Sequence, residues 1–281
     1  MGGRRREWTQ AKFEQYIQEG RGQGTREHYK PWITIHDFSS NGWSKRTSGW
    51  KTNRLHHFLS SLELKLFFLL EWSDIVIDVR EQFPLLDLDL AEEIAAEAGI
   101  RYPKDPKSGA PYVLTTDFML TLDREGQKVD VARTVKPAKE LDKTRVIEKL
   151  ELERRYWAVK GISWGIVTEK QIPTILASNI DWVYSAYRLE ATVELTIAEL
   201  RDIAKILKHR LHQAHLSINR ITANLDAEMN LEPGISLYLF RHLVARKEIE
   251  IDMRETKISV CPSARAIKHI IMNPINERIS V

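Results

Sequence analysis

The feature that most constrains the fold is a change of pattern near residue 188. Before it, apolar strand-like runs alternate with helical runs, which is typical of a mixed sheet flanked by helices. After it, three helical runs precede two short strand-like runs. We therefore predict an α/β domain over residues 1–188. We also predict a smaller, winged-helix-like domain over residues 189–281, a module that docks on DNA or on proteins.

Apolar periodicity, capping residues and Gly or Pro breaks place the individual elements. In the first domain we expect helices over 9–20, 62–72, 90–98 and 144–159, a further helix beginning at Thr168, and strands over 30–38, 74–79, 112–122, 128–135 and 161–167. In the second domain we expect helices over 197–212, 218–229 and 235–247 and strands over 249–253 and 257–260. A turn at 123–126 is expected to join two strands into a hairpin.

Composition excludes several classes of protein. The chain has 281 residues, of which 43% are hydrophobic and 29% charged, so it is globular rather than disordered or fibrous. Its longest apolar run, 64–70, is far shorter than the roughly 20 residues that span a bilayer, so we expect no membrane association. The charged N-terminus lacks the apolar core of a secretory signal. A single cysteine, Cys261, excludes an internal disulfide and a multi-cysteine zinc site, so we expect a cytoplasmic protein.

Positive charge is concentrated at the start of the chain. Residues 1–60 carry 11 Lys or Arg and 5 Asp or Glu, although the net charge of the whole chain is only +3. A basic arm of this kind indicates a polyanionic partner, because binding to phosphates releases counterions. A solvated basic tail is the alternative interpretation.

Basic and aromatic side chains interleave between residues 41 and 53, a pattern that can cover a nucleic-acid backbone. The residues that we nominate as DNA contacts in and after this segment are Arg46, Lys51, Arg54 and His57. Two alternatives stay open. The segment can be a surface loop that buries Trp43 and Trp50, and the His56–His57 pair can be plain polar loop.

Three residues are candidates for a metal-dependent catalytic centre. Asp117 lies inside one strand of the expected hairpin, Lys136 ends the other, and Glu63 lies early on a buried helix. Mg²⁺ prefers oxygen ligands, activates water and neutralises charge on an attacked phosphate, while a neighbouring Lys can stabilise developing negative charge. Asp117 is the most informative, because a carboxylate beside Leu114 and Phe118 is rarely buried unless it is paired or metal-bound.

Each of these residues also has a purely structural explanation. Asp117 can cap a turn or pair with an Arg, and Lys136 can end a strand in solvent. Glu63 can be an acid in a first helical turn that the helix dipole favours. Spacing alone leaves these alternatives open.

Six segments of the chain, in order, resemble one known family. They are G-R-G-Q-G (20–24), L-H-H-F-L-S-S-L-E-L (55–64), R-E-Q-F-P-L-L (80–86), T-D-F (116–118), V-K-P-A (135–138) and E-K-L-E-L-E-R-R-Y-W (148–157). These segments resemble TnsA, the endonuclease subunit of heteromeric cut-and-paste transposases, over residues 10–185. The C-terminal third shows only a compatible pattern.

The resemblance implies a restriction-endonuclease-like catalytic domain followed by a winged-helix domain, in a bacterial, DNA-associated protein. It implies Mg²⁺-dependent hydrolysis, with Mn²⁺ as a substitute, of the non-transferred strand at the 5′ ends of the transposon. A TnsB-like recombinase would process the 3′ ends, and a TnsC-like ATPase would bind the C-terminal domain. Glu63 matches the first acidic ligand, Asp117 the central Asp and Lys136 the catalytic Lys, and the Val135 carbonyl would be a further metal ligand.

One position departs from the family pattern. Two residues before the Lys, such nucleases carry Glu, Asp or Gln, whereas this chain has Thr134. A hydroxyl holds Mg²⁺ less strongly than a carboxylate does, which puts a second metal in question. Glu153, on a helix expected to face the sheet, is the residue expected to compensate as a water-orienting acid. Glu148 and Glu151 are expected to lie on a solvated helix face.

Two further clusters carry weaker signals. His209, His212 and His215 follow a helical spacing, but no cysteine lies near, so a zinc site is not favoured. A basic face on the last expected helix, suited to DNA or to an acidic partner, would contain Arg241, His242, Arg246 and Lys247.

The leading functional hypothesis is therefore a Mg²⁺-dependent DNA endonuclease that acts inside a transposase complex on double-stranded transposon ends. A free-standing restriction-type or repair-type nuclease of the same fold is the second hypothesis. A DNA-bound adaptor whose nuclease centre has decayed at Thr134 is the third.

Overall fold

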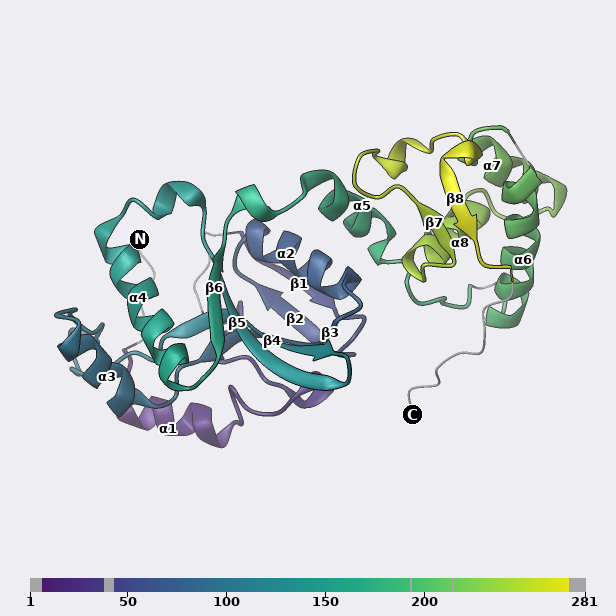
Figure 1. The fold of residues 1–281 in the computed structure, drawn as a ribbon. Coiled ribbons are helices and arrows are strands. Elements are labelled where there is room, and N and C mark those ends of the chain that lie inside the picture. Colours follow the sequence, from purple (N-terminus) through teal and green to yellow (C-terminus); the bar gives the residue numbers. More distant parts are fainter. Residues whose placement is uncertain (1–6, 38–42, 193, 214, 273–281) are drawn as a thin grey trace, which may run out of the picture. The chain divides into compact units, whose positions relative to one another are not determined.

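The computed structural model describes residues 7–37, 43–192, 194–213 and 215–272. The chain forms two compact units that separate between Ile172 and Pro173 (Figure 1). The sequence division at residue 188 places helix α5 (Thr174–Tyr184) in the first domain, but this helix packs within the second unit. The reason is Asn179, whose buried amide donates to the carbonyls of Met253 and Thr256.

The first unit is built on a mixed sheet with the strand order β3-β4-β5-β6. Its strands are Val76–Pro84 (β3), Thr115–Arg124 (β4), Gln127–Val135 (β5) and Ser163–Val167 (β6). The first three are antiparallel neighbours, which confirms the β4–β5 hairpin, whereas β6 pairs with β5 in parallel. A parallel pair requires a crossover connection, and helix α4 (Thr144–Val159) lies in it.

Helices cover both faces of this sheet (Figure 1). On one face, Met119 and Ala132 share a buried core with α4 and with helix α3 (Leu88–Glu97). On the other face, the ring of Phe118 lies 6.4 Å from that of Phe58, which in turn packs on helix α2 (Ser61–Trp72). The mixed α/β architecture predicted from the sequence is confirmed.

The N-terminal segment packs against the edge of the first unit instead of forming the strand expected over 30–38. Helix α1 (Gln10–Gln18) and Trp32 join a buried aromatic cluster, and the described residues up to 37 contain no strand there; residue 38 lies outside them. The glycine-rich loop is docked as well. At Gly22, with φ +73°, a Cβ would lie 2.3 Å from Pro84 Cγ, so only glycine fits against β3.

A short antiparallel hairpin replaces the polar loop expected before helix α2. Its strands are Lys45–Ser48 (β1) and Leu55–Phe58 (β2). Trp43 precedes it and is 47% exposed, whereas Trp50 is half-buried near Trp72. The alternative in which two tryptophans enter the core is therefore wrong for Trp43.

Strand β3 is longer than expected, because the sequence prediction ended it at residue 79. It continues through Arg80, Glu81 and Gln82, which are polar and yet buried. Buried polar groups must find partners inside the protein. The partners of these residues are described below, and they surround the candidate site.

The second unit contains helices and a two-stranded antiparallel sheet. Besides α5, its elements are Ile197–Gln213 (α6), Ile218–Glu228 (α7), Ile235–Ala245 (α8), Ile249–Ile251 (β7) and Ile267–Ile270 (β8). The strand expected over 257–260 is wrong, because Ile258–Val260 is a 3₁₀ helix and β8 is the partner of β7. The Asn179 side chain accepts the Ile258 N–H and holds this segment on α5. Within the described ranges, no helix is long and apolar enough to cross a membrane.

Candidate active site

The sequence-predicted acid and lysine meet where strands β4 and β5 end. The hydrogen-bonded register of these strands extends to the pair Phe118–Arg133. Just beyond it, Asp117 Oδ2 accepts the N–H of Val135 at 2.7 Å and a hydrogen bond from Lys136 Nζ at 3.3 Å. Lys136 Nζ also donates to the Val135 carbonyl at 3.0 Å. A carboxylate, an ammonium group and a backbone carbonyl thus converge on one point.

Glu63 approaches this point from the first turn of helix α2. Ser60 is the N-cap: its Oγ accepts the Glu63 N–H at 3.1 Å and donates to Glu63 Oε1 at 2.7 Å. The Leu59 N–H donates to Oε2 at 3.1 Å, so both carboxylate oxygens are held. Burial, and then the negative charge of Asp117, raise the pKa of Glu63 to about 7. Two carboxylates from different elements therefore form one acidic centre with Lys136.

Lys136 stays protonated in this centre. Burial alone would lower its pKa, but the charges of Asp117 and Glu153 outweigh burial and raise the pKa above its ordinary value. The ammonium group is therefore a permanent donor, and it is the cation that balances the surrounding carboxylates.

Glu153 reaches the sheet from helix α4, as expected, and contacts Thr134. Its Oε1 accepts hydrogen bonds from the hydroxyls of Thr134 and Thr116, the latter at 2.5 Å. Burial raises the pKa of Glu153 to about 7, and these hydrogen bonds oppose the rise. The Thr134 hydroxyl also accepts from Trp164 Nε1 at 3.2 Å. The proton of Thr134 is thus committed to Glu153.

The donor set fits a hard divalent cation. Two carboxylates, from Glu63 and Asp117, and the Val135 carbonyl supply only oxygen atoms, which is what Mg²⁺ prefers. Across the part of the chain that the structure describes, no three His, Cys, Asp or Glu side chains are grouped to hold a metal. A cation here would therefore use backbone and substrate oxygens besides the two carboxylates. Among the described residues, no such group includes His209, His212 or His215.

The four nominated DNA contacts do not share one environment. Arg46 is exposed on β1, and Lys51 Nζ donates to the Ser73 carbonyl at 2.6 Å. His57 is half-buried, and burial lowers its pKa. Arg54 requires a correction, because its side chain is only 8% exposed and forms an ion pair with Glu81. Its guanidinium is a structural group and not a surface contact for DNA.

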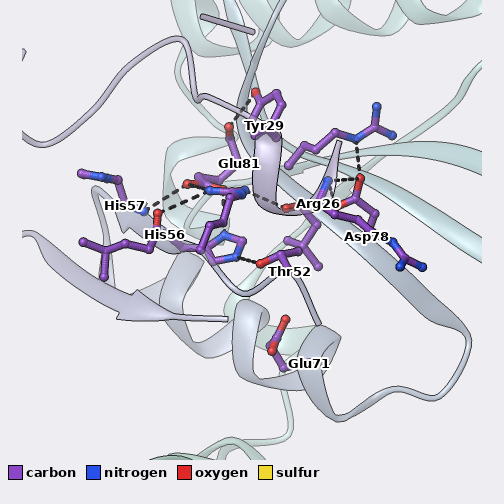
Figure 2. Close-up of polar contacts among 12 residues, drawn as sticks. Arg26, Tyr29, Thr52, His56, His57, Glu71, Asp78 and Glu81 are labelled. Atoms are coloured by element: carbon purple, nitrogen blue, oxygen red, sulfur yellow. Dashed lines mark hydrogen bonds and ion pairs between the residues drawn. The ribbon is translucent and has the colours of Figure 1, made fainter. Parts of the chain in front are cut away.

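Glu81 is the centre of a buried network that the sequence did not reveal (Figure 2). Its carboxylate is fully buried and accepts from Arg54 Nη1 at 2.8 Å, from His56 Nδ1 at 2.8 Å and from the His57 N–H at 3.1 Å. The other ring nitrogen of His56 lies 2.7 Å from Thr52 Oγ1. His56 is therefore fully enclosed within the fold. Three adjacent polar residues at 80–82, placed between apolar segments, were the available signal.

The basic face expected on the last helix is turned toward α5. Arg241 Nε donates to the Trp182 carbonyl, and His242 Nδ1 lies 2.8 Å from the Ala186 carbonyl oxygen. The guanidinium of Arg246 lies over the ring of Tyr187, 4.8 Å from its centroid. Arg241 and His242 thus bind α5 and the residues just after it, whereas Arg246 stays exposed and Lys247 is half-buried.

Comparison with known proteins gives first the class and then the family. Residues 73–169 match the family described as TnsA-like endonuclease N terminal, and residues 171–253 match TnsA endonuclease C terminal. The protein is accordingly a DNA endonuclease. It is 39% identical to the Transposon Tn7 transposition protein TnsA of Escherichia coli over 246 aligned residues. The aligned region covers 88% of this chain and 87% of that protein. The chain belongs to the TnsA endonuclease family.

Proposed function

We propose that this endonuclease hydrolyses a phosphodiester on the non-transferred strand at the 5′ ends of a transposon. Family membership supports DNA cleavage in transposition. The observation that carries the assignment of residues is the meeting of Asp117, the Val135 carbonyl and Lys136 at the strand ends, beside Glu63.

In this proposal, Glu63, Asp117 and the Val135 carbonyl hold Mg²⁺, for which Mn²⁺ can substitute. The ion supplies Lewis-acid stabilisation of charge at the attacked phosphate. Lys136 donates a hydrogen bond to the attacking water or to a phosphate oxygen as negative charge develops. The water oxygen bonds to phosphorus and the bond from phosphorus to O3′ breaks. A proton reaches the leaving oxygen, and the products are a 3′-hydroxyl and a 5′-phosphate.

Glu153 and Thr134 support Lys136 in this scheme. The charge of Glu153 is one of the causes that raise the Lys136 pKa, and the hydroxyls of Thr116 and Thr134 fix the Glu153 carboxylate in place. The sequence suggested that Glu153 orients water. We propose in addition that its charge helps to keep Lys136 protonated.

The two units would divide the work between cutting and docking. The mixed sheet with helices on both faces and acids at its strand ends supports a restriction-endonuclease-like catalytic domain. The order α6-α7-α8-β7-β8 supports a winged-helix-like domain. We assign to this second unit the docking of a TnsC-like ATPase, while a TnsB-like recombinase cuts the other strand. Of the nominated DNA contacts, Arg46 on β1 is exposed and Lys51 and His57 are partly exposed, so these three side chains would approach the DNA backbone.

Replacing Asp117 tests the centre directly. Asp117→Ala should reduce cutting at the 5′ ends by roughly 10³-fold or more, because the substitution removes a metal ligand and the partner of Lys136. The measurement is strand cleavage of a plasmid with transposon ends, in the presence of the recombinase and ATPase subunits. Asp123→Asn, at the far end of the same strand, is the matched control. Wild-type cleavage by Asp117→Ala would remove Asp117 from the mechanism.

Two further results would separate the competing functions. Cutting by the isolated chain at full rate would favour a free-standing nuclease. Crystals soaked in Mn²⁺ should show anomalous scattering beside Glu63, Asp117 and Val135. DNA binding without such a metal signal would favour the adaptor hypothesis.

A further inference from the structure

Gln82 has an unusual backbone conformation for its position. Its φ is +49°, in the left-handed region, and it lies inside strand β3. The other non-glycine residues with positive φ in the described ranges lie in turns, loops or helix termini. A left-handed residue other than glycine costs free energy and persists only where the surrounding structure imposes it, commonly at functional sites.

The register of the sheet places Gln82 opposite Asp117. Glu81 pairs with Phe118 and Phe83 with Thr116, so the intervening residues face each other across β3 and β4. Gln82 Nε2 lies 3.5 Å from Asp117 Oδ1, and the Gln82 side chain is buried. Asp117 Oδ2, as described above, is held by Val135 and Lys136. The amide of Gln82 therefore approaches Oδ1, the Asp117 oxygen to which Val135 and Lys136 do not donate.

Hydrogen bonds hold both the side chain and the backbone of Gln82. Thr115 Oγ1 donates to Gln82 Oε1 at 3.1 Å, which turns Nε2 toward Asp117. The Trp32 N–H donates to the Gln82 carbonyl at 3.2 Å, which fixes the turned-out peptide. Glu81, the preceding residue, belongs instead to the network of Arg54 and His56 (Figure 2). The Gln82 side chain thus contacts the acidic centre, whereas that of Glu81 contacts the buried network.

We propose that Gln82 is a positioning residue that orients the Asp117 carboxylate for divalent-cation binding. With Oδ2 held by a backbone N–H and Oδ1 by the Gln82 amide, rotation of the carboxylate is restricted before any ion arrives. The side chain of Thr134 does not share this task, because its hydroxyl is engaged by Glu153 and Trp164. The inference rests on the proposed function, in which Asp117 is a metal ligand.

The test measures Mn²⁺ binding to the full-length chain, by calorimetry and by the electron paramagnetic resonance spectrum of the bound ion. Gln82→Gly removes the amide but relieves the left-handed strain. We expect a dissociation constant for Mn²⁺ at least 5-fold larger than wild type and an altered spectrum of the bound ion in a chain that still folds. Glu125→Gly relieves a left-handed residue in the β4–β5 turn, where φ is +55°, and should leave the affinity and the spectrum unchanged.

A second variant covers the case in which Gln82→Gly does not fold. Thr115→Val removes only the hydroxyl that holds Gln82 Oε1 and suits a strand. It should weaken Mn²⁺ binding in the same direction. Wild-type affinity and spectrum in a folded Gln82→Gly chain, or in Thr115→Val if the first is unfolded, would overturn the positioning role.

Asp117→Ala separates this failure from failure of the proposed function. If Asp117→Ala loses Mn²⁺ binding while Gln82→Gly keeps it, only the inference about Gln82 is wrong. If Asp117→Ala keeps wild-type Mn²⁺ binding, the proposed metal centre is wrong, and the positioning role falls with it.

Discussion

Glu81 and Glu153 are both buried in the first unit, yet their electrostatics are opposite. Burial would raise the pKa of Glu81, but the charge of His56 and the hydrogen-bonded Arg54 guanidinium outweigh it and hold that pKa well below its usual range. Burial raises the pKa of Glu153 to about 7, and its neutral hydroxyl partners only oppose the rise. The difference lies in the partners, since both carboxylates are buried.

The comparison shows that the partners of a buried acid decide the direction in which its pKa is shifted. Around Glu81, cationic or protonatable groups compensate the carboxylate within the fold. Around Lys136, one ammonium group faces the carboxylates of Glu63, Asp117 and Glu153. A buried charge without full compensation destabilises the fold unless a cation arrives. The excess of acidic groups around Lys136 is therefore what the cation site proposed above would require.

The largest effect is expected from breaking the compensated network. Glu81→Ala should lower the free energy of unfolding by about 3–5 kcal/mol, because Arg54 and His56 would stay buried without their carboxylate. Urea denaturation at pH 7 measures this change. Exposed Glu97→Ala is the control and should have little effect. An unchanged urea midpoint for Glu81→Ala would remove the distinction between the two regions.

The second prediction concerns Glu153, whose pKa is raised on folding whereas that of Glu81 is lowered. When folding raises the pKa of a carboxyl group, its contribution to the free energy of unfolding is largest below the pKa of the unfolded chain, near 4.5. This contribution is lost as the pH rises through the pKa in the folded chain, about 7. In metal-free protein, Glu153→Gln should therefore be more stable than wild type by about 3 kcal/mol at pH 8, with little difference near pH 4.5. Unfolding curves at the two pH values measure it. A variant less stable than wild type at pH 8 would contradict the interpretation.

Metal addition should remove the imbalance of charge in the acidic centre. Mg²⁺ at about 100 times its dissociation constant should stabilise the folded chain by about 2.7 kcal/mol, which appears as a rise in melting temperature. Glu63→Gln should abolish most of this rise, because the variant lacks one proposed ligand. Glu151→Gln, in an ion pair with Arg154 on the surface of α4, should keep it. An equal rise in all three proteins would place the ion elsewhere.

The smallest effect is expected for Arg46→Ala, which we compare with Arg54→Ala in the same hairpin. Arg46→Ala should weaken DNA binding, reduce the slope of log affinity against log salt by about 1 and change stability by less than about 0.5 kcal/mol. Arg54→Ala should instead destabilise the fold, because Glu81 would lose its guanidinium partner. Fluorescence anisotropy at several salt concentrations, together with urea denaturation, distinguishes the two. A salt slope that Arg46→Ala leaves unchanged would place this residue outside the DNA interface.

Much of the secondary structure could be predicted from patterns of neighbouring residues. The turn at 123–126 and the helix expected over 144–159 depend on residues close together in the chain, and the structure has both where expected. Placing Asp117 and Lys136 on the two strands of one hairpin already predicted that they meet. The errors at 30–38 and 257–260 arose because contacts from distant segments, at Gln82 and Asn179, override local strand propensity there.

The sequence by itself determined the two-part organisation, the hairpin and the residue types of the acidic centre, because periodicity and spacing are local properties of the chain. Only the tertiary structure decided that Arg54 is buried in an ion pair and that Gln82 turns toward Asp117. Those assignments depend on which polar groups come into contact when strands and loops far apart in the chain pack together. Burial strengthens these hydrogen bonds and ion pairs, so the partners that the fold supplies decide the role of each polar residue.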